Sequence, residues 1–136
     1  MESFQAYLIE GSAAESSARF ATLTDRDLDP GEVTLRVTYA SINYKDALAA
    51  TGKGRIIRRF PCVGGIDAVG KVESSTDQRY APGETVIAHS HGFGVFRHGG
   101  YAQRARSPAE WVSRVPEGMT ELEAITLEDL GKAKKI

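Results

Sequence analysis

Residues 63–72 form a glycine-rich apolar run that contains a single acidic residue (VGGIDAVGKV). Its apolar positions predict a turn followed by a tightly packed strand, and Gly70 predicts a point where another backbone or a ligand comes close. Asp67 needs polar partners inside such a strand, because an unpaired buried carboxylate is costly. The upstream run 41–46 (SINYKD) supplies candidates, so we expect these two stretches to meet and form a polar cleft.

Short alternating or apolar segments recur along the chain at roughly ten-residue spacing, with turn residues between them. The clearest is 33–40, where Val33, Leu35, Val37 and Tyr39 share one face, and Phe20 is expected to point inward from a strand at 18–23. Further strands are expected at 5–10, 65–72, 85–89, 100–106 and 111–115. Because βαβ repetition is absent, the pattern predicts a mainly β fold, a barrel or a sandwich. The expected core comprises Val33, Leu35, Val37, Ile66, Val69, Val72, Val86 and Ile87.

Two regions favour helix. Residues 43–51 are rich in helix formers, with Ser41 or Asn43 as the cap. Near the C-terminus, Thr120 stands three residues before Glu123, which is the spacing of a capping box. A second short helix is expected to open at Thr126.

Composition excludes several classes of protein. The 136 residues suit one domain with a real core, and a net charge of −1 gives no electrostatic case for nucleic acid or an anionic membrane. The single cysteine, Cys62, rules out an intrachain disulfide, fits a reducing cytosol and is expected to be a buried hydrophobe. No apolar run reaches the ~20 residues that a membrane span needs, and the polar start of the sequence leads us to expect no signal peptide. We therefore expect a cytoplasmic protein without a membrane partner.

Five motifs follow one another in a specific order: 41–46 (SINYKD), 59–61 (RFP), 65–70 (GIDAVG), 82–86 (PGETV) and 97–102 (RHGGYA). Together they resemble the zinc-free medium-chain dehydrogenase/reductases, above all the quinone-oxidoreductase-like and acryloyl-CoA-reductase-like branch. The resemblance covers residues 5 to 122. It implies a GroES-like, partly open β-barrel as the catalytic domain, and NADPH as the hydride donor.

Zinc-dependent relatives place a metal-binding cysteine where this chain has Asn43 and a histidine where it has Ile66. Neither residue supplies a ligand that zinc prefers, so no metal site is expected. The spacing of His89, His91 and His98 fits no zinc pattern and favours a structural role in a loop.

The same family carries a nucleotide-binding domain, which needs a strand, a glycine-rich turn and a helix. The two candidate turns, 52–54 (GKG) and 92–94 (GFG), lack the third glycine. We expect residues 1–124 to form a GroES-like catalytic domain, 125–136 to resemble the segment by which the family returns to the barrel, and no nucleotide-binding domain. We therefore expect this chain to bind no NADPH by itself. An uncovered face near Phe93, Val95 and Phe96 would then either self-associate into a homo-oligomer or be covered by residues 119–136.

The resemblance also implies roles for individual residues. Tyr44 resembles the tyrosine on the nicotinamide side, which orients the cofactor amide or relays a proton; the alternative is a tyrosine packed on the barrel. Asn43 either donates to a substrate carbonyl or caps a helix. Asp46 and Asp67 are expected to be structural groups of the cleft wall.

Charged residues are also expected near the mouth of the active-site cleft. Arg59 ends a basic run that would meet phosphates of NADPH or an acyl-CoA, or that is an ordinary charged loop. Arg97 and His98 match the family pattern beside the substrate, and Gly99 and Gly100 permit close backbone approach.

The sequence thus predicts the substrate-side domain of an NADPH-dependent oxidoreductase that acts on a quinone or an enoyl thioester. Alone, this domain is expected to be inactive. The alternative is a stand-alone GroES-like module that binds a ligand or partner without enzymatic activity.

Overall fold

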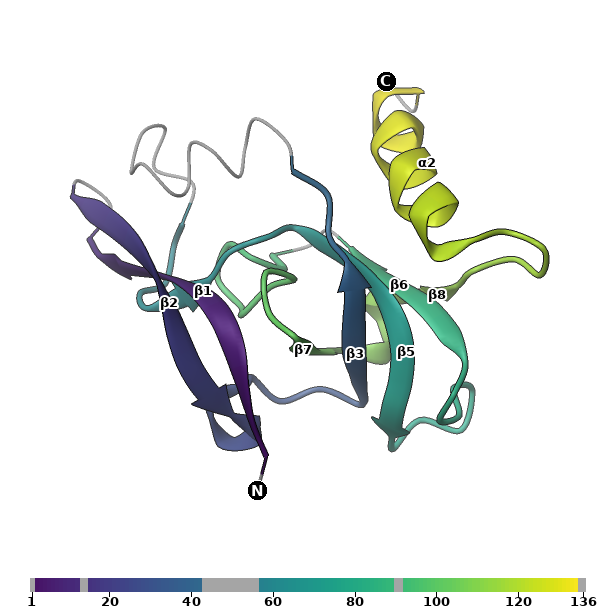
Figure 1. Cartoon of the computed structure of the whole chain (residues 1–136), viewed down its shortest axis with the longest axis horizontal. Coiled ribbons are helices and arrows are strands. Elements are labelled where there is room, and N and C mark those ends of the chain that lie inside the picture. The colour runs from purple at the N-terminus through teal and green to yellow at the C-terminus, as the bar shows by residue number, and fades with distance from the viewer. Residues whose placement is uncertain (1, 13–14, 43–56, 90–91, 135–136) are drawn as a thin grey trace.

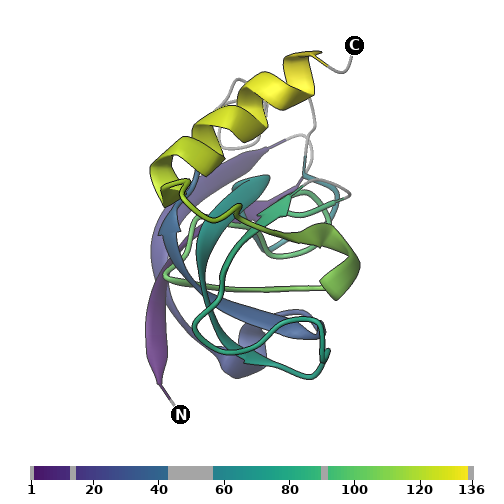
Figure 2. The ribbon, with the colours of Figure 1, turned by 90° about the vertical axis from the view of Figure 1, so that its right-hand side faces the viewer.

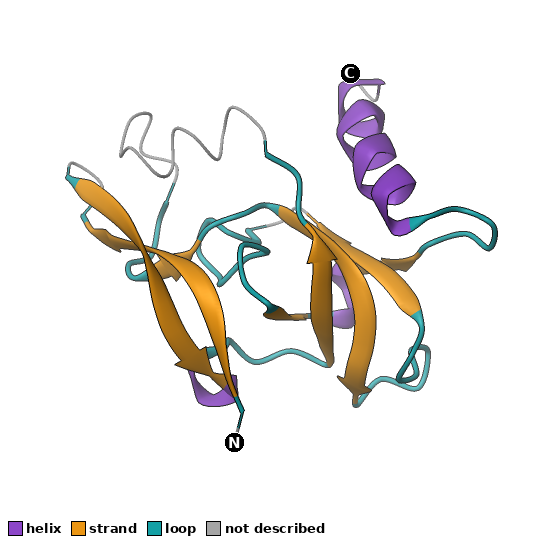
Figure 3. Ribbon diagram, viewed as in Figure 1, coloured by secondary structure: helices purple, strands orange, loops and turns teal. Residues whose placement is uncertain are grey.

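The computed structural model describes residues 2–12, 15–42, 57–89 and 92–134. Two antiparallel sheets make up most of it, and one helix lies beside the larger sheet (Figures 1 and 3). The strands are β1 (Ser3–Gly11), β2 (Ser16–Thr24), β3 (Val33–Tyr39), β4 (Cys62–Val63), β5 (Asp67–Ser75), β6 (Thr85–His89), β7 (Arg104–Ser107) and β8 (Val112–Arg114). The helices are α2 (Glu121–Lys134) and two short 3₁₀ turns, η1 (Asp25–Asp27) and η3 (Ala109–Trp111). The predicted helix at 43–51 lies outside the described residues.

The smaller sheet has the order β2-β1-β4, and its β1–β2 pairing runs without interruption from Ser3↔Thr24 to Gly11↔Ser16. Its inner face buries Phe4, Ala6 and Leu8. The prediction that Phe20 points inward is wrong: Phe20 is 74% exposed, whereas Ala21 is buried. The register explains this, because Ala21 lies opposite buried Ala6, and Phe20 lies opposite Tyr7 on the other face, with the ring centroids 5.4 Å apart.

The larger sheet has the order β7-β3-β5-β6-β8, and its central strand β5 is buried on both faces. One face holds a core around Phe93 that includes Val33, Leu35, Val72 and Val86. The other face buries Val69 and Ile87 against Ala124 and Ile125 of α2. The predicted core is therefore divided between two faces, while Val37 and Ile66 are only half-buried. Tyr39 is 43% exposed because the β3–β5 register shifts between Val37 and Tyr39.

Helix α2 begins where the sequence predicted. The Glu123 carboxylate accepts a hydrogen bond from the Thr120 amide at 2.9 Å, and the Glu123 amide donates to the Thr120 hydroxyl at 3.1 Å, which confirms the capping box. The helix then continues to Lys134, so the prediction of a second helix at Thr126 is wrong. Figure 2 shows α2 across one end of the larger sheet. No helix among the described residues is long and apolar enough to cross a membrane.

The expected uncovered face is corrected in part: Phe93 is fully buried in the core of the larger sheet, whereas Phe96 is 45% exposed as expected, and α2 covers the Val69–Ile87 face instead. The two sheets meet where the Tyr7 amide donates to the Tyr101 carbonyl at 2.7 Å, and they do not close into a continuous barrel. Gly70 permits the close approach predicted for it: a Cβ there would lie 1.9 Å from the Arg36 carbonyl oxygen on β3. The fold is mainly β and partly open, as expected of a GroES-like domain.

Candidate functional site

Asp67, the first residue of β5, is fully buried and holds the chain just before residue 43. The Ser41 amide donates to Oδ1 of Asp67 at 3.0 Å, and the Ser41 hydroxyl lies 2.7 Å and 2.6 Å from its two carboxylate oxygens. The Tyr101 hydroxyl donates to the Ser41 carbonyl at 2.8 Å. This group, Asp67, Ser41 and Tyr101, is called the Asp67 anchor below. It confirms that residue 41 meets the glycine-rich strand; Asp46 lies outside the described residues.

Closely packed glycines surround the Asp67 anchor. A Cβ on Gly99 would lie 2.1 Å from the Gly65 carbonyl oxygen, and a Cβ on Gly100 would lie 2.2 Å from the Asp67 carbonyl oxygen. The Gly100 amide donates to the Gly65 carbonyl at 3.0 Å. The predicted role of Gly99 and Gly100 in close backbone approach is therefore confirmed, and the close approach is to the protein's own strand.

A second carboxylate, Asp29, holds the chain just after residue 56. The Arg59 guanidinium donates to both oxygens of Asp29, and the His98 amide donates to Oδ2 at 2.7 Å. Burial favours the neutral acid, but the hydrogen bonds from Arg59 and from the His98 amide outweigh it and keep the pKa of Asp29 below its ordinary value. Asp29, Arg59 and His98 are called the Asp29 anchor below.

The His98 ring is also used within the protein. Its Nδ1 accepts a hydrogen bond from the Val63 amide at 3.0 Å. Burial lowers the pKa of His98, because the positive charge loses water. The neighbouring Arg97 donates to the Pro30 carbonyl, and its guanidinium lies 5.5 Å from the ring centroid of Trp111. Trp111 is half-buried beneath it rather than a full member of the core.

Cys62 is fully buried beside the Asp29 anchor, as predicted. Burial raises the pKa of its thiol to about 12. The thiolate is the nucleophilic form, so this cysteine is a poor nucleophile at neutral pH.

The two anchors hold the chain on either side of residues 43–56. Ser41 is fixed on one side, and on the other Ile57 is buried with Ile9 and Cys62 while the Arg58 amide donates to the Val95 carbonyl at 2.9 Å. The predicted site residues Asn43, Tyr44 and Asp46 lie outside the described residues. Of the others, Asp67 belongs to the first anchor, and Arg59 and His98 belong to the second with Arg97 beside them.

Sequence reasoning missed Asp29 and the Tyr101 hydroxyl as anchoring groups. Asp29 stands in an acid-rich stretch that reads as a surface connection, and nothing in its neighbours marks it. Tyr101 follows the RHGG motif, so the tyrosine next to the predicted site was the available signal.

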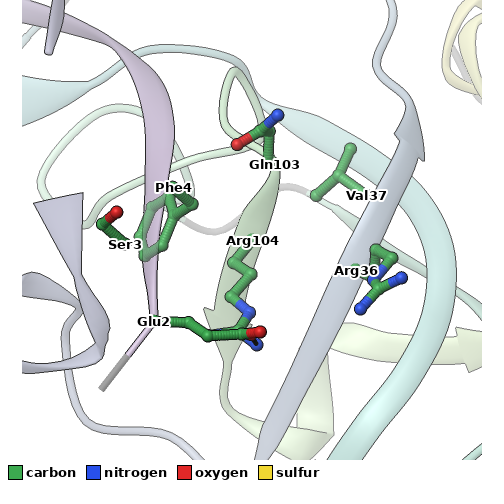
Figure 4. A pocket seen from close by; sticks show the side chains of 7 residues that line it. All are labelled: Glu2, Ser3, Phe4, Arg36, Val37, Gln103 and Arg104. Atoms are coloured by element: carbon green, nitrogen blue, oxygen red, sulfur yellow. Dashed lines mark hydrogen bonds and ion pairs between the residues drawn. The ribbon is translucent and has the colours of Figure 1, made fainter. Parts of the chain in front are cut away.

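A pocket of about 540 Å³ opens between β1, β3 and β7, away from both anchors (Figure 4). The Arg104 side chain reaches toward Glu2 at its edge and also binds Asp25 at 3.1 Å and Glu73 at 2.8 Å. Its positive charge is therefore neutralised within the protein. The described residues that line the pocket are Glu2, Ser3, Phe4, Arg36, Val37, Gln103 and Arg104.

The N-terminus of α2 does not fit a nucleotide phosphate. A helix N-terminus binds phosphate through its free amides and its dipole. The first turn of α2 instead carries Glu121 and Glu123, and the Thr120 hydroxyl already accepts the Glu123 amide. The described residues also contain no group of three or more histidine, cysteine, aspartate or glutamate side chains placed to hold a metal ion.

The comparison with protein families identifies the class. The chain belongs to the alcohol dehydrogenase GroES-like domain family, whose model matches residues 29–117. Two relatives make the resemblance more specific: the probable acrylyl-CoA reductase AcuI of Escherichia coli, 40% identical over 93% of this chain, and the putative quinone oxidoreductase YhfP of Bacillus subtilis, 40% identical over 94%. These matches confirm the resemblance to the zinc-free medium-chain dehydrogenase/reductases. The chain spans about 39% of the length of each relative.

Solved structures of relatives support the same family assignment. The chain is 40% identical to the yhdH oxidoreductase of Salmonella enterica in complex with NADP, with a TM-score of 0.86 over 90% of this chain and 38% of that one. It is likewise 40% identical to Bacillus subtilis yhfP with NAD bound, with a TM-score of 0.87 over 92% of this chain and 38% of that one. The nucleotide-bound relatives are thus more than twice as long as the part that this chain matches.

Proposed function

We propose that this chain is the substrate-side part of an NADPH-dependent oxidoreductase that reduces a quinone or an enoyl thioester of the acryloyl-CoA type. One observation carries the proposal: relatives with those names, and solved relatives with NADP or NAD bound, match this chain at about 40% identity over only 38–39% of their own length. We further propose that the chain binds no NADPH and is inactive without a nucleotide-binding part.

The catalytic pair in this proposal is Asn43 and Tyr44. The Asn43 amide would donate to the substrate carbonyl and stabilise negative charge on its oxygen. The Tyr44 phenol would orient the nicotinamide or carry a proton. The two anchors support this assignment, because they fix the chain immediately before and shortly after these residues.

Three charged or polar groups are proposed as ligand contacts. Arg59 is 40% exposed while it binds Asp29, so one side of its guanidinium remains open to a cofactor phosphate. Arg97 and His98 are proposed on the substrate side. Their present contacts with Pro30 and Val63 also suit a purely structural role, and substrate binding at these two residues would compete with those contacts. Asp46 and Asp67 are proposed as structural groups.

A second candidate is a stand-alone module that binds a ligand. The pocket between β1, β3 and β7 is the observation in its favour. Arg104 is already neutralised there, so the charge available to a ligand would come from the exposed Arg36 and from Glu2.

The decisive experiment restores a nucleotide-binding part. This chain replaces the matching segment of the Escherichia coli relative, and NADPH oxidation is followed with acryloyl-CoA and with a quinone. The chimera should turn over one of them, and Tyr44→Phe should lower the rate by about 100-fold or more. Tyr7→Phe, a conservative change at a tyrosine to which the proposal gives no role in the reaction, serves as the control and should keep the parent rate. A folded chimera without turnover would reject the proposed function.

A further inference from the structure

Strand β2 leaves one edge of the smaller sheet without a described pairing partner. It is nine residues long, whereas the other terminal strands, β4, β7 and β8, have two, four and three residues. Natural proteins block such edges with prolines, bulges or charged residues. In β2 the pairing with β1 is unbroken, no proline is present, and the one charged residue, Arg19, is tied to Glu10 at 2.7 Å.

The backbone contacts of β1 show which groups of β2 point outward. The Tyr7 amide donates to the Tyr101 carbonyl and the Tyr7 carbonyl accepts from the Gly64 amide, so both groups point away from β2. In an antiparallel ladder, the backbone amide and carbonyl groups of two directly opposite residues either point toward each other and form hydrogen bonds or all point away from the pair. Tyr7 lies opposite Phe20, so the amide and carbonyl of Phe20 point away from β1. By alternation, those of Ala18 and Thr22 do the same.

We propose that β2 pairs with β2 of a second copy of this chain, antiparallel and about a two-fold axis at Phe20. This interface does not depend on the proposed enzymatic function. Ala18, Phe20 and Thr22 would each exchange hydrogen bonds with the partner's Thr22, Phe20 and Ala18. Two three-stranded sheets would join into one of six strands.

The side chains favour a second copy in this register. With Phe20 on the axis, the two Phe20 rings, each 74% exposed in one copy, face one another and extend the Tyr7–Phe20 contact into an aromatic row. Arg19 then lies opposite the partner's Ala21. A shift of the axis by one residue toward the N-terminus would place Arg19 opposite the partner's Arg19, and like charges directly opposite are destabilising. The charge pattern therefore favours the Phe20 register over the register centred on Arg19.

Mass measurement by light scattering, from micromolar to millimolar protein, tests the interface. The parent should approach twice its 14.7 kDa as concentration rises. Phe20→Lys places two like charges opposite each other in the dimer and should stay at 14.7 kDa. Thr22→Pro removes an outward amide, keeps the backbone hydrogen bonds to β1 and loses the side-chain bond from Gln5, and it should stay at 14.7 kDa too. Leu122→Lys, a matched change at an exposed apolar residue of α2, should dimerise as the parent does. Circular dichroism confirms that each variant keeps its strands.

Cross-linking tests the register. In a hydrogen-bonded antiparallel pair the Cα atoms are about 5.5 Å apart, inside the range of about 4.4–6.8 Å that a disulfide needs. Phe20→Cys should therefore give a disulfide-linked dimer on mild oxidation, and Arg19→Cys should not. Cys62 is fully buried and does not compete. A parent that is monomeric throughout, a Phe20→Lys variant that still dimerises, or preferential cross-linking of Arg19→Cys would each overturn the proposal.

Discussion

The two anchors hold neighbouring parts of the chain with different chemistry. Asp67 is fully buried, and its carboxylate accepts hydrogen bonds from the amide and the hydroxyl of Ser41. Asp29 is 14% exposed and binds a guanidinium that is itself 40% exposed. Water can replace a lost partner at Asp29 but not at Asp67, because an unmet buried group bears its full desolvation penalty. Burial, more than formal charge, should therefore decide which anchor matters most to the fold.

The largest effect is expected for Asp67→Ala. It leaves the amide and hydroxyl of Ser41 without their acceptor and opens a cavity, so the free energy of unfolding should fall by about 3 kcal/mol in urea. Asp67→Asn, which retains one acceptor oxygen, should lose less. A loss below about 1 kcal/mol for Asp67→Ala would contradict the ranking of the anchors.

Arg59→Ala should cost less, about 1–2 kcal/mol, because Asp29 keeps the His98 amide and gains access to water. Arg58→Ala is the matched control, since Arg58 is exposed and its described contact is made by its backbone amide. It should change stability by less than about 0.5 kcal/mol. If Arg59→Ala lowered the free energy of unfolding more than Asp67→Ala, the charge of the partners rather than their burial would decide which anchor contributes more to stability.

The Asp29 anchor should also respond to acid. The pKa of Asp29 is lowered in the folded state, so its contribution is complete above the unfolded value of about 3.9 and is lost as pH falls through the folded value. The stability difference between the parent and Arg59→Ala should thus be constant near neutral pH and shrink below about pH 4. Carboxyl titration followed by NMR checks the direction, and an Asp29 pKa above 3.9 would contradict it.

The smallest expected effect comes from His98. Burial lowers its pKa, so the folded state resists protonation and stability falls as pH drops below the unfolded value of about 6.5. His98→Gln keeps an acceptor for the Val63 amide and removes the titrating group. Thermal melts between pH 7.5 and 5.5 should therefore show a flatter pH dependence for this variant, and identical profiles would exclude the histidine as the cause.

The difference between the anchors also explains what sequence could predict. Asp67 stood out because an acid in an apolar, glycine-rich strand requires a partner, and Ser41 lay in the polar run proposed for it. Asp29 gave no such signal: its partners lie 30 and 69 residues away, and only the folded sheets bring them together. Phe20 was misplaced for a related reason. Alternation in 18–23 fits either face, and the register with β1 decided in favour of small Ala21.

The roles of Asn43 and Tyr44 rest on the family resemblance rather than on geometry, since both lie outside the described residues. What the described residues do supply is a hydrogen-bonded anchor on each side of them and a helix N-terminus that is unsuited to phosphate. The central proposal, that this chain provides the substrate side of a reductase and depends on a separate part to hold the nucleotide, rests on the relatives that it matches over 38–39% of their length.

Calorimetric titration of NADPH into this chain, followed by an assay of NADPH oxidation with acryloyl-CoA or a quinone in the same sample, tests that claim most directly. Hydride transfer requires the reacting atoms to be held about 3–3.5 Å apart, and the glycine pairs at 52–54 and 92–94 lack the third glycine expected of a turn that fixes the pyrophosphate. The account predicts no measurable heat of binding and no turnover above the blank. Micromolar binding accompanied by turnover would contradict it.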